Sequence, residues 1–332
     1  MFIKLSTLIL VVQLGYSAGR LEISYNLPNL SACAKWNQNA SIFTNNSVEK
    51  SYLRALFIDK DNNLFASRFY SSHIFKWQSD NSDQFSLITI NESIYLYGLF
   101  VSSIGDIYFS DDGVYRWIKA TETTEMVAQF CKICTSMFIS IHDIIYCSAR
   151  NSHTIVTRSL HNHSNLMTIV AGVGFNGSAA NMLAYPHGIF LYTNLDLYVA
   201  DTGNHRIQLF HPGQINAVTI AGTPDTIELI APNSVAVDAN EYVYIIDSAS
   251  IKRIIALTPY GFRCIVSCTE LVSSSDRLVD PESMTFDSFG NIYVIDEKKR
   301  IKKFFILNDT CSKYYDVDIE IKVHSFYYIR YY

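Results

Sequence analysis

The sequence predicts an all-β fold, a six-bladed β-propeller with four-stranded blades. The first observation is composition, because the 332 residues include 22 Tyr and 20 Phe while charged residues make up only 17%. This balance favours half-buried strands over long solvated helices. The second is a unit of short alternating apolar strands that occurs six times. The third is its period of about 40 to 50 residues, which is typical of a propeller blade.

The unit is clearest at 186–210, "PHGIFLYTNLDLYVADTGNHRIQLF". Related stretches at 232–257 and 281–305 share its Pro start, its two apolar strands around a Tyr, and its Asp. Fainter copies occupy 53–77, 97–118 and 135–158. The equivalent aromatic residues in the six copies are Phe65, Tyr108, Tyr146, Tyr198, Tyr244 and Tyr293.

The strands of the fourth copy are the easiest to assign. They are expected at 187–192, 195–200, 206–210 and 217–222. Outer strands of other blades are expected at 85–90, 124–128, 166–172 and 261–268. The sixth blade has no outer strand of its own, and the apolar segment 36–45 is left over. Because an open ring would expose unpaired strand edges, we expect 36–45 to complete the sixth blade.

The seven cysteines fit this ring. We expect three disulfides, Cys33–Cys311, Cys134–Cys147 and Cys264–Cys268. The first joins the closing strand to the end of the sixth blade, the second spans the inner hairpin of the third blade, and the third closes a small loop. Cys131 is left without a partner. The Cys-x2-Cys spacing formed with Cys134 resembles half of a zinc finger, but no second pair stands at the required spacing.

The N-terminus indicates export. Lys4, the apolar run 5–14 and small residues at 15–19 predict a signal peptide over 1–18, with an uncleaved signal anchor as the alternative. No other apolar stretch reaches membrane length, so we expect a secreted chain that is not held in a membrane. We also expect a glycoprotein. The Asn-x-Ser/Thr acceptors are Asn29, Asn39, Asn45, Asn91, Asn162, Asn176 and Asn308.

The propeller is expected to span 33–312, and the tail 313–332 has no place in the six blades. The formal net charge of −5 provides no basic field, so a nucleic-acid partner is not expected. The one dense basic cluster, "KKRIKK" at 298–303, is interpreted as an outward-facing part of a strand. We expect a monomer.

The stretch "LYVADTGNHRIQLF" at 197–210 resembles the NHL repeat, with Asn204-His205-Arg206 in place of Asn-His-Leu. The resemblance covers about 33–312 and is weaker in the first three blades. The chain is most similar to secreted NHL-repeat proteins abundant in bdelloid rotifers, through the segments 33–36, 134–147 and 261–264. The resemblance implies a six-bladed propeller and says little about function.

Repeated aspartates form one set of candidate site residues. Asp111, Asp201, Asp247 and Asp296 close second strands, and Asp59, Asp238 and Asp287 follow innermost strands. An Asp beside a turn accepts backbone hydrogen bonds, so a structural role is expected for both groups. If several of these carboxylates pointed into the channel mouth instead, they would be suited to calcium.

His187 is the sharpest single candidate. NHL-type propellers include the lyase that completes peptide amidation, where a Pro-His pair supplies zinc ligands at the channel mouth, and Pro186-His187-Gly188 matches this pattern. Catalytic zinc needs three protein ligands. The equivalent positions of the next two blades hold Asn233 and Glu282. We therefore interpret His187 as a polar residue of the channel rim and expect no cofactor, with zinc or calcium in the axial channel as the alternative.

The sequence therefore favours a secreted, non-enzymatic binding module with a protein or glycan partner. The alternative is a metal-dependent propeller enzyme, similar to the amidating lyase or to a lactonase or esterase, with a cation in the axial channel. A third hypothesis is a structural component of an extracellular matrix. The predicted glycan acceptors are compatible with all three.

Overall fold

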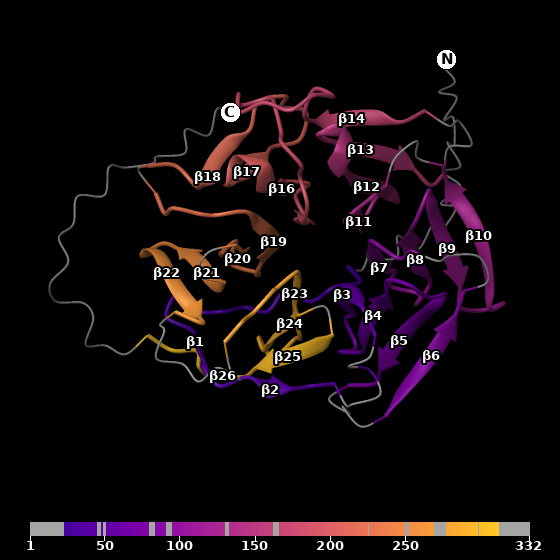
Figure 1. The fold of residues 1–332 in the computed structure, drawn as a ribbon, viewed down its shortest axis with the longest axis horizontal. Coiled ribbons are helices and arrows are strands. Elements are labelled where there is room, and N and C mark those ends of the chain that lie inside the picture. The colour runs from indigo at the N-terminus through magenta and orange to yellow at the C-terminus, as the bar shows by residue number, and fades with distance from the viewer. Residues whose placement is uncertain are drawn as a thin grey trace, which may run out of the picture.

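A computed structural model describes residues 23–44, 48, 51–79, 84–90, 95–129, 133–161, 166–224, 226–249, 252–268, 277–297 and 299–311. Six four-stranded antiparallel sheets are arranged as blades around a central axis (Figure 1). This is the predicted fold. The predicted signal peptide, the tail, Cys131, Asn45, Asn91 and Asn162 lie outside the described residues.

The first three blades follow the chain from the innermost strand outward. The first contains β3 (Leu53–Ile58), β4 (Leu64–Arg68), β5 (His73–Trp77) and β6 (Phe85–Thr89). The second contains β7 (Leu99–Val101), β8 (Ile107–Ser110), β9 (Val114–Ile118) and β10 (Thr123–Ala128). The third contains β11 (Met137–Ile139), β12 (Ile144–Ala149), the 3-10 turn η1 (Arg150–Ser152), β13 (Thr154–Ser159) and β14 (Thr168–Ala171).

The last three blades repeat this order. The fourth contains β15 (Ile189–Leu191), β16 (Leu197–Asp201), the 3-10 turn η2 (Thr202–Asn204), β17 (Arg206–Phe210) and β18 (Val218–Ala221). The fifth contains β19 (Pro232–Val237), β20 (Val243–Asp247), β21 (Arg253–Thr258) and β22 (Gly261–Val266). The sixth contains β23 (Ser283–Phe286), β24 (Ile292–Asp296) and β25 (Arg300–Phe304), which β2 (Ser41–Ile42) completes.

The N-terminal strand closes the ring as predicted, because β2 pairs antiparallel with β25. In Figure 1 the indigo β2 therefore lies beside the yellow end of the chain. The predicted single strand over 36–45 is wrong in one respect. It is two short strands, and β1 (Lys35–Trp36) pairs with β26 (Ile306–Asn308) in a separate two-stranded sheet. The closure is thus made at two places.

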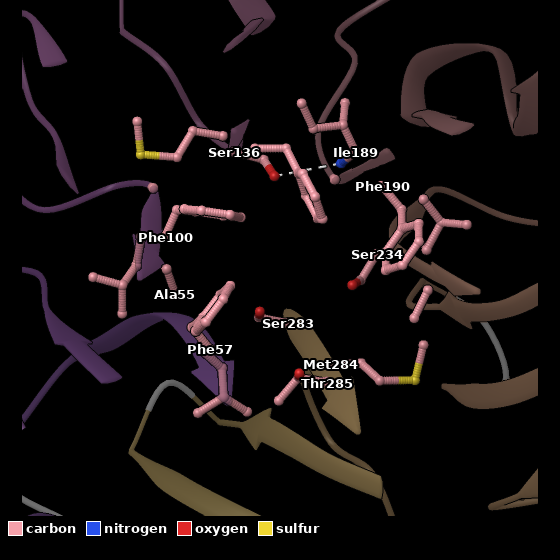
Figure 2. A pocket seen from close by; sticks show the side chains of 18 of the residues that line it. Ala55, Phe57, Phe100, Ser136, Ile189, Phe190, Ser234, Ser283, Met284 and Thr285 are labelled. Atoms are coloured by element: carbon pink, nitrogen blue, oxygen red, sulfur yellow. Dashed lines mark hydrogen bonds between the residues drawn. The ribbon is translucent and has the colours of Figure 1, made fainter. Parts of the chain in front are cut away.

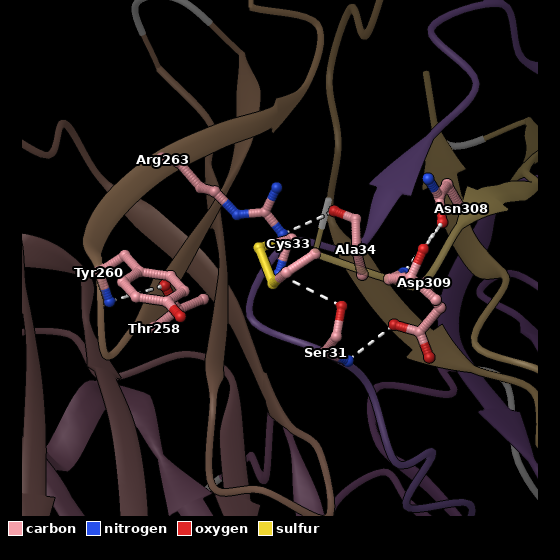
Figure 3. The surroundings of a disulfide bond; sticks show 10 residues. Ser31, Cys33, Ala34, Thr258, Tyr260, Arg263, Asn308 and Asp309 are labelled. Atoms are coloured by element: carbon pink, nitrogen blue, oxygen red, sulfur yellow. Dashed lines mark hydrogen bonds between the residues drawn. A yellow bond between two sulfur atoms is a disulfide. The ribbon is translucent and has the colours of Figure 1, made fainter. Parts of the chain in front are cut away.

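The three disulfides have the expected pairings. Cys33 and Cys311 have Cα atoms 5.1 Å apart and join the two ends of the propeller. Next to them Asp309 accepts a hydrogen bond from the Ser31 N–H, and Arg263 donates to the Ala34 carbonyl (Figure 3). The other pairs are Cys134–Cys147 and Cys264–Cys268, with Cα separations of 5.4 and 5.6 Å. Such bonds indicate folding in an oxidising environment. Among the described residues no helix is long and apolar enough to cross a membrane.

The six aromatic residues that define the repeat occupy equivalent positions in the sheets. Each lies on the second strand of its blade and pairs with the inner-strand residue eight positions earlier. The pairs are Phe57–Phe65, Phe100–Tyr108, Phe138–Tyr146, Phe190–Tyr198, Ala236–Tyr244 and Thr285–Tyr293. This shared register confirms the sequence alignment of all six blades, including the faint ones.

The outward orientation expected for the basic cluster at 298–303 is wrong for two of its lysines. Lys302 is buried, and its Nζ lies 3.0 Å from the Asp296 carboxylate. Lys303 is also buried, with its Nζ 5.0 Å from the Tyr293 ring centroid. The physical reason is that β2 pairs along the outer edge of β25, so β25 is an inner strand of a four-stranded sheet rather than its exposed edge. A cation buried this way has to be paired.

Candidate functional site

The innermost strands of all six blades surround a cavity of about 100 Å³ on the propeller axis. Figure 2 looks into it, with side chains pointing inward from β3, β7, β15, β19 and β23 among others. The lining residues form three successive rings, described below from the floor to the mouth. A cavity of this size holds a few water molecules or one small chemical group.

Aromatic side chains form the floor. Phe57, Phe100, Phe138 and Phe190 contact each other in sequence, with ring centroids 5.0, 5.1 and 5.3 Å apart. Tyr25, from the segment before β1, packs edge-on against Phe138 and Phe190 and donates a hydrogen bond to the Leu191 carbonyl. The N-terminal segment therefore covers the axis on this side, and the cavity is a pocket rather than an open pore.

Small residues form the second ring. They are Ala55, Gly98, Ser136, Gly188, Ser234 and Ser283. Glycine is required at position 188, because a Cβ there would stand 2.5 Å from the Asn233 carbonyl oxygen. The Gly188 N–H donates to that same carbonyl at 2.9 Å, so the fourth and fifth blades touch through their backbones. Small side chains at this level keep the axis open above the phenylalanines.

The third ring is polar and forms the mouth. Its members are Arg54, Tyr97, Thr135, His187, Asn233 and Glu282, one from each blade. The Arg54 guanidinium donates to both carboxylate oxygens of Glu282, at 3.0 and 2.8 Å. Its other terminal nitrogen lies 3.4 Å from His187 Nε2. A buried ion pair with a histidine on its flank therefore occupies the mouth.

The structure brings the three predicted rim positions to this mouth. His187 Nδ1 lies 3.1 Å from the Asn233 carbonyl oxygen, and Arg54 connects His187 to Glu282. Sequence reasoning missed Arg54, Tyr97 and Thr135. Each stands eleven residues before the repeat-defining aromatic of its blade, as His187 stands before Tyr198. Counting back from those aromatics would have found all six mouth residues.

The described part of the chain contains no group of three or more His, Cys, Asp or Glu side chains arranged to hold a metal ion. The seven predicted aspartates do not line the axial cavity. His187 and Glu282 reach the mouth, but the cation beside them is the Arg54 guanidinium. The residues described at the mouth therefore do not make up the three-ligand set of catalytic zinc.

The aspartates that close second strands have a structural role, but most of them bond to a more distant part of the chain than the adjacent turn that was predicted. Three of the four accept a backbone hydrogen bond from the segment that precedes their own inner strand, seventeen residues earlier. The pairs are Ala184 N–H to Asp201, Ile230 N–H to Asp247 and Val279 N–H to Asp296, at 2.6 to 2.8 Å. The mouth residue follows three positions after each donor. These carboxylates therefore position His187, Asn233 and Glu282. In the second blade, the Asp111 N–H donates to the Gly113 carbonyl within its own turn.

The aspartates that follow innermost strands fix turns. Asp59 accepts the Asn63 N–H, Asp238 the Tyr242 N–H and Asp287 the Asn291 N–H. Each carboxylate thus satisfies the backbone of the turn into the second strand. This turn function is the role expected from the sequence.

Asp238 provides a pH test of this turn. Burial raises the pKa of its carboxyl to about 6, although hydrogen bonds from the Tyr242 and Asn240 N–H groups and the Tyr244 hydroxyl act in the opposite direction. The folded state then holds the proton more tightly than the unfolded chain does. The contribution of Asp238 to the free energy of unfolding therefore falls as pH rises between about 4 and 6.

We expect Asp238→Asn to flatten this dependence, because asparagine has no proton to lose. Urea unfolding of both proteins at several pH values across that window measures the two slopes. The exposed Asp61, next to the same kind of turn in the first blade, offers Asp61→Asn as a matched control that keeps the wild-type slope. Identical slopes for the wild type and Asp238→Asn would contradict the prediction.

Comparison with known proteins identifies the fourth blade. The model of the NHL repeat matches residues 183–210. This range begins just before the segment that Asp201 anchors and ends with β17. Within it, Asn204 donates to the Gly177 carbonyl, and His205 Nδ1 accepts the Ala231 N–H of the following blade. No curated protein matches the chain in sequence.

Solved structures share the fold at low sequence identity. Virginiamycin B lyase from Staphylococcus aureus, bound to quinupristin, has 14% identity and a TM-score of 0.56, with 77% of this chain and 80% of that chain covered. A gluconolactonase from Xanthomonas campestris has 10% identity and a TM-score of 0.58, with coverage of 86% and 99%. The nidogen/laminin complex contains a chain with 15% identity and a TM-score of 0.56, with coverage of 71% and 85%. At these identities the similarity extends to the fold alone.

Proposed function

We propose that this six-bladed propeller, with an NHL repeat in its fourth blade, is an extracellular, non-enzymatic binding module whose ligand contacts the face around the channel mouth. The observation that carries the proposal is Arg54. Its guanidinium lies between Glu282 and His187 at the axis, where a metal-dependent propeller would hold its cation.

The electrostatics of the mouth support binding over metal catalysis. Glu282 is 6% exposed, and its charge is balanced by Arg54 at 2.8 Å. A divalent cation placed beside Arg54 would meet a permanent positive charge in a poorly solvated site. It would also have to displace the guanidinium from Glu282. The mouth is therefore better suited to a ligand that hydrogen-bonds than to a resident metal.

The fold alone does not decide between these classes. Similar propellers include a lyase, a gluconolactonase and a chain of the nidogen/laminin complex, so both enzymes and a protein complex use this architecture. Function has to be argued from the site. At this site the charged side chains of Arg54 and Glu282 are engaged with each other, and Arg54 also lies beside His187.

An extracellular location agrees with two features. The propeller has three disulfides, which persist in oxidising compartments. The four glycan acceptors within the described residues are all exposed, namely Asn29, Asn39, Asn176 and Asn308. Exposure is what N-glycosylation requires, so these asparagines support secretion and glycosylation as parts of the proposal.

Elemental analysis tests the proposal against the enzyme alternative. The chain should be expressed through a secretory pathway and purified without chelator and without a metal affinity step. We expect much less than one equivalent of zinc or calcium, and no hydrolysis of lactone or ester substrates. A stoichiometric metal that His187→Ala removes, accompanied by turnover, would overturn the proposal. Arg54→Met serves as a second variant, because loss of the guanidinium frees Glu282 and measures how strongly Arg54 excludes a cation.

A further inference from the structure

A cluster of aromatic side chains lies next to the channel mouth, between the first and second blades. We call it the tyrosine cleft, and it consists of Tyr52, Phe69, Tyr70, Tyr95 and Tyr97. The side chains of Tyr52, Tyr70 and Tyr95 are 48%, 60% and 42% exposed. Large aromatic residues exposed together on a monomer mark a binding surface more often than they do when scattered.

The rings of the tyrosine cleft pack against each other edge to face. Tyr70 meets Tyr52, Phe69 and Tyr95 with centroids 5.7, 4.6 and 5.8 Å apart and interplanar angles of 88°, 69° and 72°. Phe69 in turn packs edge-on against Tyr97 of the mouth. This packing holds the rings in place without help from a ligand, while Tyr52, Tyr70 and Tyr95 keep part of their surface exposed.

A cavity of about 120 Å³ lies within the cleft, lined by Tyr52, Leu53, Arg54, Phe69 and Tyr70. Arg54 lines this cavity and the axial cavity as well, so the two adjoin at its side chain. The Arg54 guanidinium carbon lies 5.9 Å from the Phe69 ring centroid, and its Nε is buried without a hydrogen-bond partner. An unused donor therefore lies in the wall between the two cavities.

We propose that the tyrosine cleft and the channel mouth together bind a neutral oligosaccharide, an inference that rests on the proposed binding function and specifies its ligand class. One sugar ring stacks on the exposed tyrosine faces. A neighbouring sugar unit reaches toward the mouth, where planar polar side chains and serine hydroxyls meet its hydroxyl groups.

The charges of the site favour a neutral ligand. Arg54 and Glu282 already neutralise each other, so a charged ligand would have to break a buried ion pair to find a partner. A polyol needs no such exchange, because it donates and accepts hydrogen bonds without charge. Among the described residues nothing hydrogen-bonds the hydroxyl groups of Tyr52, Tyr70 or Tyr95, which leaves them available to sugar hydroxyls.

The dimensions of the site favour a saccharide over a protein. A standard protein interface buries about 800 Å² on each partner and uses about 20–30 residues a side. The cleft and mouth comprise ten positions around two small cavities, because the five cleft residues and the six mouth residues have Tyr97 in common. Two adjoining cavities with aromatic and polar walls suit a chain of a few sugar rings better than they suit the broad, flat surface of a protein partner.

Calorimetric titration tests the inference directly. The probes are four neutral hexasaccharides (chitohexaose, cellohexaose, laminarihexaose and mannohexaose) with heparin and polygalacturonate as charged comparators. We expect at least one neutral probe to bind the glycosidase-treated, full secreted chain. Tyr70→Ala should weaken that binding about tenfold or more, since loss of one stacked ring costs a hot-spot contact. Tyr70→Phe keeps the ring and loses only the hydroxyl, so it should weaken binding clearly less than Tyr70→Ala does.

Tyr260→Ala is the matched control, because Tyr260 is 76% exposed at the turn between β21 and β22 and takes no part in the cleft. It should bind as the wild type does. The inference is overturned if no neutral probe binds, if only the charged polymers bind, or if Tyr70→Ala binds normally. Each of these outcomes leaves the non-enzymatic proposal standing, since that proposal fails only on a bound metal with turnover.

Discussion

Replacing both Cys33 and Cys311 with alanine should lower the free energy of unfolding by about 5 kcal/mol. The two cysteines are 278 residues apart in sequence, so their bond restricts almost the whole unfolded chain. In the chain-entropy account, stabilisation grows with the length of the closed loop. Urea unfolding of the wild type and the double variant gives the difference, and the unfolding slope should also rise because the unfolded chain becomes less compact.

The control is the pair Cys264–Cys268, which closes a loop of only four residues in sequence separation. Replacing both with alanine should cost about 2 kcal/mol or less by the same relation. The comparison separates ring closure from the mere loss of a disulfide. Equal losses for the two double variants would show that the Cys33–Cys311 bond adds nothing beyond the pairing of β2 with β25, and would contradict the prediction.

Much of the fold could be predicted because each blade repeats the same local pattern. Strand alternation and the aromatic residue of the second strand identify six equivalent units, and the observed register places Tyr198 and Tyr293 at the same level of their sheets. Ring closure followed from counting strands, since the sixth blade lacked one. The disulfide pairs followed from the order of the strands, which brings Cys33 and Cys311 to the same place.

The chemistry of the mouth could not be predicted in the same way. The Arg54–Glu282 ion pair joins residues 228 positions apart, and it exists because the first and last blades become neighbours when the ring closes. Local periodicity reports which face of a strand is buried, but not which side chain arrives from the next blade. The tyrosine cleft has the same origin, since Tyr70 and Tyr95 meet through a bridge between two loops.

The burial of Lys302 was missed for a related reason. Two lysines in a row suggest a solvated strand, but the pairing with β2 makes β25 an inner strand of its sheet. Its partner Asp296 belongs to the repeated aspartates, so the pattern that predicts a turn also supplies the counter-ion. The repeat thus contains polar positions that are as regular as its apolar ones. The next prediction tests how much these polar positions contribute.

Asp201→Ala should lower the free energy of unfolding by about 3–5 kcal/mol, because it leaves a buried charge and a buried donor without partners. The Asp201 carboxylate is fully buried and lies 2.7 Å from Arg206 Nε and 2.6 Å from the Ala184 N–H. Arg206 would keep its hydrogen bonds to the carbonyls of the loop at 178–182, but no described carboxylate would replace Asp201 beside it.

Two further variants make the result specific. Asp201→Asn keeps an acceptor for the Ala184 N–H and removes only the charge, so its loss should lie between that of the alanine variant and the wild type. The side chain of Asp61 is 67% exposed and pairs with Lys60. Asp61→Ala breaks this exposed ion pair and should scarcely change the free energy of unfolding. If Asp201→Ala were as mild as Asp61→Ala, the repeated aspartate would not anchor the blade. A large loss in the free energy of unfolding would mean that Asp201 anchors the fourth blade. Because Ala184 leads directly to His187, Asp201 would then hold the binding face in place as well.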